Sequence, residues 1–272
     1  MPKFYTSLRI DLSMTSVTVT CPAQGSDGEP ALLATCSFDK KTPMAVAVAL
    51  GHALSKTGLD RRTAAIVLSD EWARIFMVTP PTNTERMRDC QAALALRFQL
   101  LFGETHGDWS VQADWNAGHP FLACALPKAL GDAVLHSCAE NGVSVVSMVP
   151  RFIRCWNRWH RHLGESTWFG IVHTGSLTLA AIEGGRLVEI RRVTVPQQAL
   201  QKQAWLNDQV GRETLRLGLP MPRNLRLCGD IPDMWLAQSN GAGIDVRRLD
   251  PVPAAIEPAG VDTTAVLAGN EV

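Results

Sequence analysis

The residues best suited to metal or thiol chemistry lie scattered along the chain. The seven cysteines include no Cys-x-x-Cys pair, and several stand inside apolar runs such as FLACAL, which is typical of buried, reduced thiols. The closest approach to a metal-ligand pair is His160 and His162 in WHRHL. Because residues two apart on a helix point about 200° apart around its axis, the sequence predicts no metal site here.

Nucleophilic catalysis has an equally weak basis in the sequence. Ser69 and Asp70, with a distant histidine, would supply the residue types of a catalytic triad, but no G-x-S-x-G turn presents the serine. Neither G-x-G-x-x-G nor G-x-x-x-x-G-K-[ST] occurs, so the glycine-rich loops of dinucleotide and P-loop sites have no counterpart. We therefore expect no catalytic residues.

Positive charge is concentrated in one segment, Pro150–Leu163, which is predicted to be an amphipathic helix. The cations on its polar side are Arg151, Arg154, Arg158 and Arg161. They form a candidate docking face for an acidic partner or lipid headgroups, and the alternative is a solvated face without a partner. Over the whole chain 26 basic residues balance 26 acidic ones, which favours no nucleic acid and no direct membrane partner.

The elements that would position a site come in two similar series. Ser7–Cys21 alternates apolar and polar residues around a polar turn at Ser13–Ser16, which predicts a hairpin. Trp168–Ile182 repeats this pattern around Thr174 and Gly175. With 272 residues, 46% of them apolar, the chain is long enough for one large domain or two lobes with a sizeable core.

Between the two hairpins the pattern predicts a helix over Thr84–Leu101 and a strand over Pro120–Leu126, followed by a return to the main sheet. The last residues, 251–272, are rich in Pro, Ala and Gly, and we expect them to be disordered. No apolar run reaches the roughly 18 residues that cross a membrane, and charged residues interrupt the N-terminal pattern that a secretory signal needs. These features predict a cytosolic protein.

The order of these elements resembles the actin-like fold, and within it the PilM family of type IV pilus assembly and the cytoplasmic region of GspL in type II secretion. The segments that carry the resemblance are IDLSMTSVTV at Ile10–Val19, WFGIVHTGSLTLAAIEGGRLVEIRRVTVP at Trp168–Pro196, and LRLCGDIPDMWLAQSNGAGIDVRRLDP at Leu225–Pro251. The resemblance implies an α/β fold of two duplicated, RNase H-like lobes. It further implies a small subdomain inserted into the first lobe.

The resemblance also sets the expected domain boundaries. The first lobe is expected over 1–150, with the inserted subdomain at about 80–142. A linking helix at 151–165 would join it to a second lobe at 166–250.

In active members of the superfamily two hairpin turns close on the nucleotide phosphates, because glycine lets backbone N–H groups approach the oxygens, and a carboxylate in each turn positions metal and water. In this chain Asp11 stands at the first turn, Ser13 replaces the glycine, and Thr18 falls where pilus-assembly relatives often carry a cation. At the second turn His173 replaces the carboxylate, and Gly175 is the remaining element.

The family's adenosine loop usually holds paired glycines, and here Gly229 is followed by Asp230, whose charge would repel phosphate. The resemblance therefore implies a degenerate nucleotide site. We expect no resident cofactor and no metal, because an imidazole is a poor ligand for magnesium. Binding of ATP with magnesium stays the alternative.

For function, the resemblance implies a non-enzymatic cytosolic scaffold, a pseudo-ATPase, of a bacterial type IV pilus-like assembly platform at the inner membrane. Its expected partner is the cytosolic N-terminal peptide of a membrane-anchored PilN-like protein, with an assembly ATPase or other platform proteins as further candidates. The helix Thr84–Leu101 and the strand Pro120–Leu126 are expected to frame the peptide groove. The alternatives are an active actin-like ATPase or small-molecule kinase, and a GspL-like module of a type II secretion system.

Overall fold

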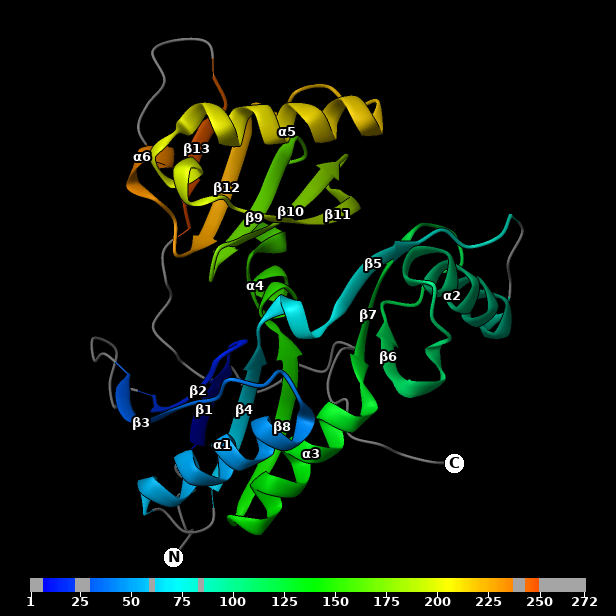
Figure 1. Ribbon diagram of the computed structural model, residues 1–272. Coiled ribbons are helices and arrows are strands. Elements are labelled where there is room, and N and C mark those ends of the chain that lie inside the picture. The colour runs from blue at the N-terminus through cyan, green and yellow to red at the C-terminus, as the bar shows by residue number, and fades with distance from the viewer. Residues whose placement is uncertain (1–6, 23–29, 59–61, 83–85, 237–242, 250–272) are drawn as a thin grey trace, which may run out of the picture. The chain divides into compact units, whose positions relative to one another are not determined.

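The computed structural model describes residues 7–22, 30–58, 62–82, 86–236 and 243–249. The described residues form two compact units (Figure 1), unit 1 up to Arg154 and unit 2 from Cys155 onward. This boundary lies inside the helix predicted over 151–165 as a linker. The tail predicted to be disordered, 251–272, lies outside the described residues.

Unit 1 is built on a five-stranded sheet in the order β3-β2-β1-β4-β8. Its strands are β1 (Ser7–Leu12), β2 (Ser16–Cys21), β3 (Ala31–Ser37), β4 (Arg62–Leu68) and β8 (Val143–Pro150). The first three form an antiparallel meander, whereas β1, β4 and β8 run parallel. In β1 every second residue is buried, as the alternation in the sequence predicts.

Two helices, α1 (Pro43–Thr57) and α3 (Lys128–Glu140), lie side by side along this sheet (Figure 1). The side chain of Thr42 caps α1 by accepting the N–H of Ala45 at 3.3 Å, and Gly58 ends the helix with a φ of 60°. The apolar residues of both helices and of the sheet form one core cluster.

A three-stranded antiparallel sheet, in the order β5-β7-β6, forms the inserted subdomain. Its elements are β5 (Arg74–Val78), α2 (Met87–Phe102), β6 (Trp109–Ala113) and β7 (Phe121–Pro127), with short 3-10 turns η1 (Asp70–Trp72) and η2 (His106–Asp108). α2 packs Leu94 and Phe98 into a separate core cluster.

The bounds of this subdomain differ from the predicted 80–142. β5 lies before residue 80, because Phe76 and Val78 alternate into the core under α2. α3 lies before residue 142 but packs Leu130 and Val134 into the core of the first sheet. The apolar stripe of α3 therefore packs mainly with α1 and the first sheet.

Unit 2 repeats the topology of the first sheet, in the order β11-β10-β9-β12-β13. Its strands are β9 (Thr167–His173), β10 (Ser176–Glu183), β11 (Arg186–Thr194), β12 (Asn224–Gly229) and β13 (Asp245–Arg248). Again the first three form an antiparallel meander and the next two continue the sheet in parallel. The same strand order in both units confirms the predicted duplication in an α/β chain.

The helical elements of unit 2 are η4 (Gln197–Gln201), α5 (Gln203–Leu217) and the short α6 (Asp233–Leu236). They join the sheet in a second core, in which the indole of Trp235 stacks on Trp205 at 5.5 Å and donates to the carbonyl of Ala199 at 2.9 Å. None of the helices in the described ranges combines the length and hydropathy of a membrane-spanning segment.

The helix α4 (Arg151–Trp159), which η3 (His160–His162) continues, follows directly on β8. Its first turn belongs to unit 1, where Phe152 and Ile153 are buried. The position of this first turn decides how the first candidate site is built.

Candidate functional site

The turn between β1 and β2 is closed by its own serine. The hydroxyl oxygen of Ser13 accepts the N–H groups of Thr15 at 3.1 Å and Ser16 at 2.8 Å. A serine side chain that caps its own turn in this way satisfies donors that a glycine would leave open. The N–H groups of Thr15 and Ser16 are therefore already bonded within the turn.

The carboxylate of Asp11 lies between two guanidinium groups. Arg9 approaches it with Nε 2.8 Å from Oδ2 and Nη2 2.9 Å from Oδ1, and Arg151 places its Nη2 3.0 Å from Oδ1. All three side chains are at least 70% buried, with 26%, 18% and 22% of Arg9, Arg151 and Asp11 exposed. Two cations around one carboxylate leave a net positive charge, which opposes a divalent metal ion.

Thr18, the third predicted position of this turn, lies directly across from Asp11 in the register of β1 and β2. Its hydroxyl is 3.5 Å from that of Thr35 on β3. No cation stands at position 18, but Arg9 and Arg151 supply cations to the same carboxylate from other elements. The structure thus brings Asp11, Ser13 and Thr18 together at one end of the β1–β2 hairpin.

The segment after β4 fixes both this turn and the start of α4. The indole of Trp72 donates to the carbonyl of Ser13 at 2.8 Å. The buried carboxylate of Asp70 accepts the N–H of Phe152 at 2.8 Å, which caps the first turn of α4. Asp70, weighed in the sequence as a triad member beside Ser69, therefore has a structural role as a cap.

In unit 2 the β9–β10 turn uses two residues with positive φ, Thr174 at 44° and Gly175 at 75°. Such a pair of dihedral angles is typical of the tight two-residue turns that join antiparallel strands. The carbonyl of Gly175 accepts the N–H of Val195 at 2.8 Å. Gly175, predicted as the remaining element of a phosphate turn, serves here as the second residue of this tight turn.

His173 and Asp230 meet at the end of the unit 2 sheet, where Nδ1 of the imidazole is 3.0 Å from Oδ2 of the carboxylate. Gly229 holds Asp230 there with a φ of 91°, and a Cβ at Gly229 would overlap the carbonyl oxygen of Val172. The N–H of Asp230 donates to that same carbonyl at 2.8 Å. The three predicted positions His173, Gly229 and Asp230 therefore form one local cluster.

The four arginines of the 151–161 segment do not form one exposed face. Arg151 turns toward β1 and binds Asp11, because it opens the helix beside the end of that strand. Arg154 and Arg158 are half-buried, and the guanidinium of Arg158 lies 5.4 Å from the centre of the Trp159 ring. Of the four, Arg161 alone is exposed. Arg151 therefore does not belong to the candidate docking face, which stays a prediction for the other three arginines.

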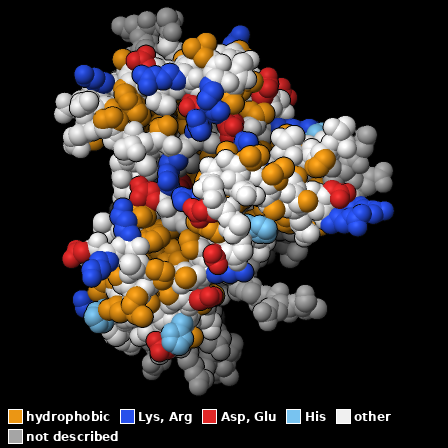
Figure 2. Space-filling model, turned by 45° about the vertical axis from the view of Figure 1, so that its right-hand side comes forward, with side chains coloured by type: hydrophobic (Ala, Val, Ile, Leu, Met, Phe, Trp, Pro, Cys, Tyr) orange, Lys and Arg blue, Asp and Glu red, His pale blue; other side chains and the backbone are white. Residues whose placement is uncertain are grey.

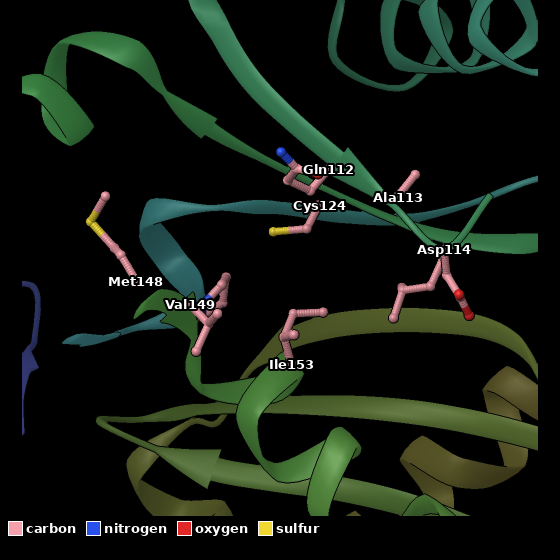
Figure 3. A pocket seen from close by; sticks show the side chains of 9 residues that line it. Gln112, Ala113, Asp114, Cys124, Met148, Val149 and Ile153 are labelled. Carbon is pink, nitrogen blue, oxygen red and sulfur yellow. The ribbon is translucent and has the colours of Figure 1, made fainter. Parts of the chain in front are cut away.

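A small apolar cavity of about 30 Å³ lies where the inserted sheet meets β8 and the first turn of α4 (Figure 3). Its lining includes Leu122 and Cys124 of β7, Met148 of β8 and Ile153 of α4. This volume is enough for a water molecule but small for a peptide side chain. An apolar side chain could enter only if the lining moved apart.

The lining of this cavity includes only one of the two elements predicted to frame the peptide groove, and that frame stays a prediction. β7 lines it as expected, but α2 does not, because successive residues of a strand face opposite sides. Phe121, Ala123 and Ala125 face α2, whereas Leu122 and Cys124 face the cavity. Burial, with a smaller effect of the Asp70 charge, raises the pKa of the Cys124 thiol to about 12, so this cysteine is no ready nucleophile.

The prediction of buried, reduced thiols holds only in part, because Cys21, Cys36 and Cys155 are only half-buried. All seven are free, and Cys90, Cys124, Cys138 and Cys228 are buried. A hydrogen bond with Cys155, together with burial, raises the pKa of Cys228. Among the described residues no three His, Cys, Asp or Glu side chains lie close enough together to hold a metal ion.

Comparison with protein-family models and with curated protein sequences found no match. Among solved structures, a PilM–PilN type IV pilus biogenesis complex aligns over 90% of this chain and 88% of its own, with a TM-score of 0.59 and 13% identity. A Bacteroides thetaiotaomicron protein with an actin-like ATPase fold and unknown function aligns over 90% of this chain and 91% of its own, with a TM-score of 0.59 and 11% identity.

The cytoplasmic domain of EpsL, an inner-membrane component of the type II secretion system of Vibrio cholerae, aligns over 94% of this chain and 90% of its own. Its TM-score is 0.53 and its identity 11%. These likenesses establish the actin-like fold. They confirm the resemblance to PilM and to the secretion protein at the level of structure.

Proposed function

We propose that this chain is a non-enzymatic, actin-like scaffold, a pseudo-ATPase, of a type IV pilus or type II secretion assembly platform. It would work at the cytosolic face of the inner membrane and hold the cytosolic N-terminal peptide of a membrane-anchored, PilN-like partner. An assembly ATPase or other platform proteins are further candidate partners. Attachment to the membrane would then come through the partner.

The observation that carries the proposal is the occupied first turn. Ser13 bonds the N–H groups that would meet phosphate, and Arg9 and Arg151 bind the carboxylate that would position magnesium. Freeing Asp11 would break two charge-assisted hydrogen bonds, one from each arginine, each stronger than a neutral one. Magnesium-ATP therefore does not fit these residues, and we derive no catalytic step through it.

The second turn supports the same proposal independently. His173 takes the carboxylate position of the turn and is paired with Asp230. A paired imidazole offers no hard oxygen ligand to magnesium. In both turns the side chain at the carboxylate position, Asp11 or His173, is thus paired with a charged side chain of its own unit.

The place proposed for the partner peptide is the apolar cavity between β7, β8 and α4. The solved PilM–PilN complex shows that a protein of this fold binds a partner. In this chain Leu122 and Ile153 offer apolar surface to an anchor side chain, and such anchors are the usual means by which a short peptide binds a groove. The small volume requires the inserted sheet to shift when the peptide enters.

The test uses synthetic peptides for the cytosolic N-termini of the single-span membrane proteins in the pilus and secretion assemblies of the same bacterium. Fluorescence anisotropy with the whole chain should detect one saturable binder. Leu122→Asp in the cavity should weaken that binding at least tenfold, whereas Leu100→Asp on the exposed side of α2 should not. Equal effects of both substitutions, or no binder, would contradict the proposed peptide site.

A cell-fractionation experiment tests the mode of membrane attachment. Deletion of the partner's cytosolic peptide should release this chain from the membrane fraction. Unchanged membrane association after that deletion would show that the partner peptide is not the attachment point.

A further inference from the structure

Among the residues that the structure describes, no strand pairs with the outer edge of β3. β3 is the last strand of the unit 1 sheet on that side, and within the described ranges it pairs only with β2. Its surface carries the exposed side chain of Leu32, which is 65% exposed. An open edge presents unpaired N–H and C=O groups, which can pair with an extended segment.

A groove of about 450 Å³ runs between this edge strand and α1. Thr35, Cys36 and Phe38 line it from the strand side, and Val48 and His52 line it from the helix. This volume falls in the range of sites that hold ligand groups, and it is about fifteen times that of the cavity beside β7. The groove is therefore wide enough for side chains of an extended segment.

The chemistry of the groove favours an acidic occupant. None of its lining residues is acidic, and Lys56 and His52 stand on its helix side. Nζ of Lys56 lies 3.6 Å from Sγ of Cys36, so the ammonium group is held across the groove. The connection from β3 to α1 adds the exposed Lys40 and Lys41 against one carboxylate, Asp39. A carboxylate of the occupant would meet these cations at the rim.

In the space-filling view hydrophobic and histidine side chains gather on the lower part of unit 1, where α1 and α3 lie (Figure 2). On α1 the exposed apolar residues include Met44 and Val48, four residues apart on one side of the helix. A helix beside an open strand offers an extended peptide two kinds of contact. The strand pairs with its main chain, and the helix packs against every second side chain.

We propose that the groove between β3 and α1 binds an extended, acidic peptide segment of another protein, which adds as a strand to the edge of β3. Alternate apolar side chains of the segment fill the space beside Phe38 and Val48. Its carboxylates lie next to Lys56 and His52. The site is at the opposite edge of the sheet from β8, so it is separate from the cavity of the proposed function.

The probe is a fluorescein-labelled decapeptide in which valine alternates with glutamate, and its counterpart alternates valine with lysine. Anisotropy with the whole chain should give saturable binding of the acidic peptide, at least tenfold tighter than that of the basic one, equivalent to about 1.4 kcal/mol. Amide hydrogen exchange should slow in β3 when the acidic peptide is bound. Absence of saturable binding, or equal binding of the two peptides, would overturn the proposal.

Two pairs of matched variants locate the binding. Lys56→Glu should reverse the preference between the peptides, whereas Lys128→Glu, the same change at an exposed site on α3, should leave it intact. Val48→Asp should weaken binding at least tenfold. Val146→Asp on β8 should not, although Val146 is as exposed as Val48, at 48% against 50%.

Equal effects within either pair would place the peptide elsewhere and overturn the proposal. Sedimentation of the unliganded protein tests whether a second copy of the chain occupies the groove between β3 and α1. Self-association that Val48→Asp abolishes would show that the groove joins two copies of the chain and would also overturn it.

Discussion

The substitution Asp11→Asn distinguishes a structural role of this carboxylate from a catalytic one. Asparagine keeps the shape and one acceptor oxygen, so the change removes charge and leaves Arg9 and Arg151 without their counter-ion. A carboxylate kept for metal binding is held at a cost in stability, so its removal would leave stability unchanged or raise it. A carboxylate that binds two arginines should instead destabilise the fold when it is lost.

The size of the effect follows from burial and hydrogen bonding. Exposed ion pairs contribute about 0–1 kcal/mol, and removal of one partner from a fully buried pair costs about 3–5 kcal/mol. Asp11, Arg9 and Arg151 lie between these limits, with 18% to 26% of their side chains exposed. We therefore expect Asp11→Asn to lower the free energy of unfolding by about 2 kcal/mol.

Urea unfolding followed by circular dichroism is the assay. With a slope of about 2 kcal/mol per molar urea, the midpoint should fall by about 1 M. Asp108→Asn, at an exposed aspartate, is the control and should leave the midpoint in place. A double-mutant cycle with Arg151→Gln should give a coupling energy of about 1 kcal/mol. An unchanged or raised midpoint in Asp11→Asn would refute the structural role.

Three further outcomes follow from single contacts. Gly229→Ala should destabilise unit 2 by more than about 2 kcal/mol in urea unfolding, because its Cβ would overlap the carbonyl of Val172; an effect below 1 kcal/mol would contradict the positive φ. Thr42→Ala should cost about 1 kcal/mol by removal of the α1 cap, measured in the same way, and no change would show that the cap does not contribute. Burial raises the pKa of Cys124 from 9.0 to about 12, so between pH 9 and 12 the thiol loses its proton in the unfolded chain but keeps it in the folded one. The contribution of this thiol to the free energy of unfolding is therefore complete below pH 9, and above pH 9 it falls by up to about 1.4 kcal/mol per pH unit. Cys124→Ala should remove that part of the slope between pH 9 and 10, and identical slopes would contradict the burial of the thiol.

The order of elements was open to prediction from the sequence because each strand and helix carries its own periodicity. The hairpins at Ser13–Ser16 and at Thr174 with Gly175 are local features, whose turn residues and alternating strands lie within one short segment. The duplication followed from the repetition of that local pattern. These are properties that the chain displays without knowledge of distant contacts.

The bonds of the first turn were less accessible because one of them is long-range. Arg9 and Asp11 are two apart on a strand and share a face, so their pairing could have been read from the sequence. Arg151 reaches Asp11 from 140 residues away, and no local pattern indicates that contact. Its place on a helix with three other arginines favoured a docking face instead.

The frame of the cavity shows a second limit of local reasoning. The alternation of β7 predicts that its two faces differ, but it does not tell which face meets α2. Phe121, Ala123 and Ala125 face α2 because the aromatic side chains of Phe76, Phe98 and Phe102 cluster on that side. Packing partners far apart in sequence thus decide which face of β7 lines the cavity.

Calorimetric titration with magnesium and a non-hydrolysable ATP analogue tests the central claim most directly, with magnesium alone and nucleotide alone as controls. Because Ser13, Arg9 and Arg151 already bond the groups that would meet the phosphates and the metal, we expect no saturable heat at millimolar ligand. Saturable binding with a Kd below about 100 µM, more than about 5 kcal/mol, would contradict the pseudo-ATPase account.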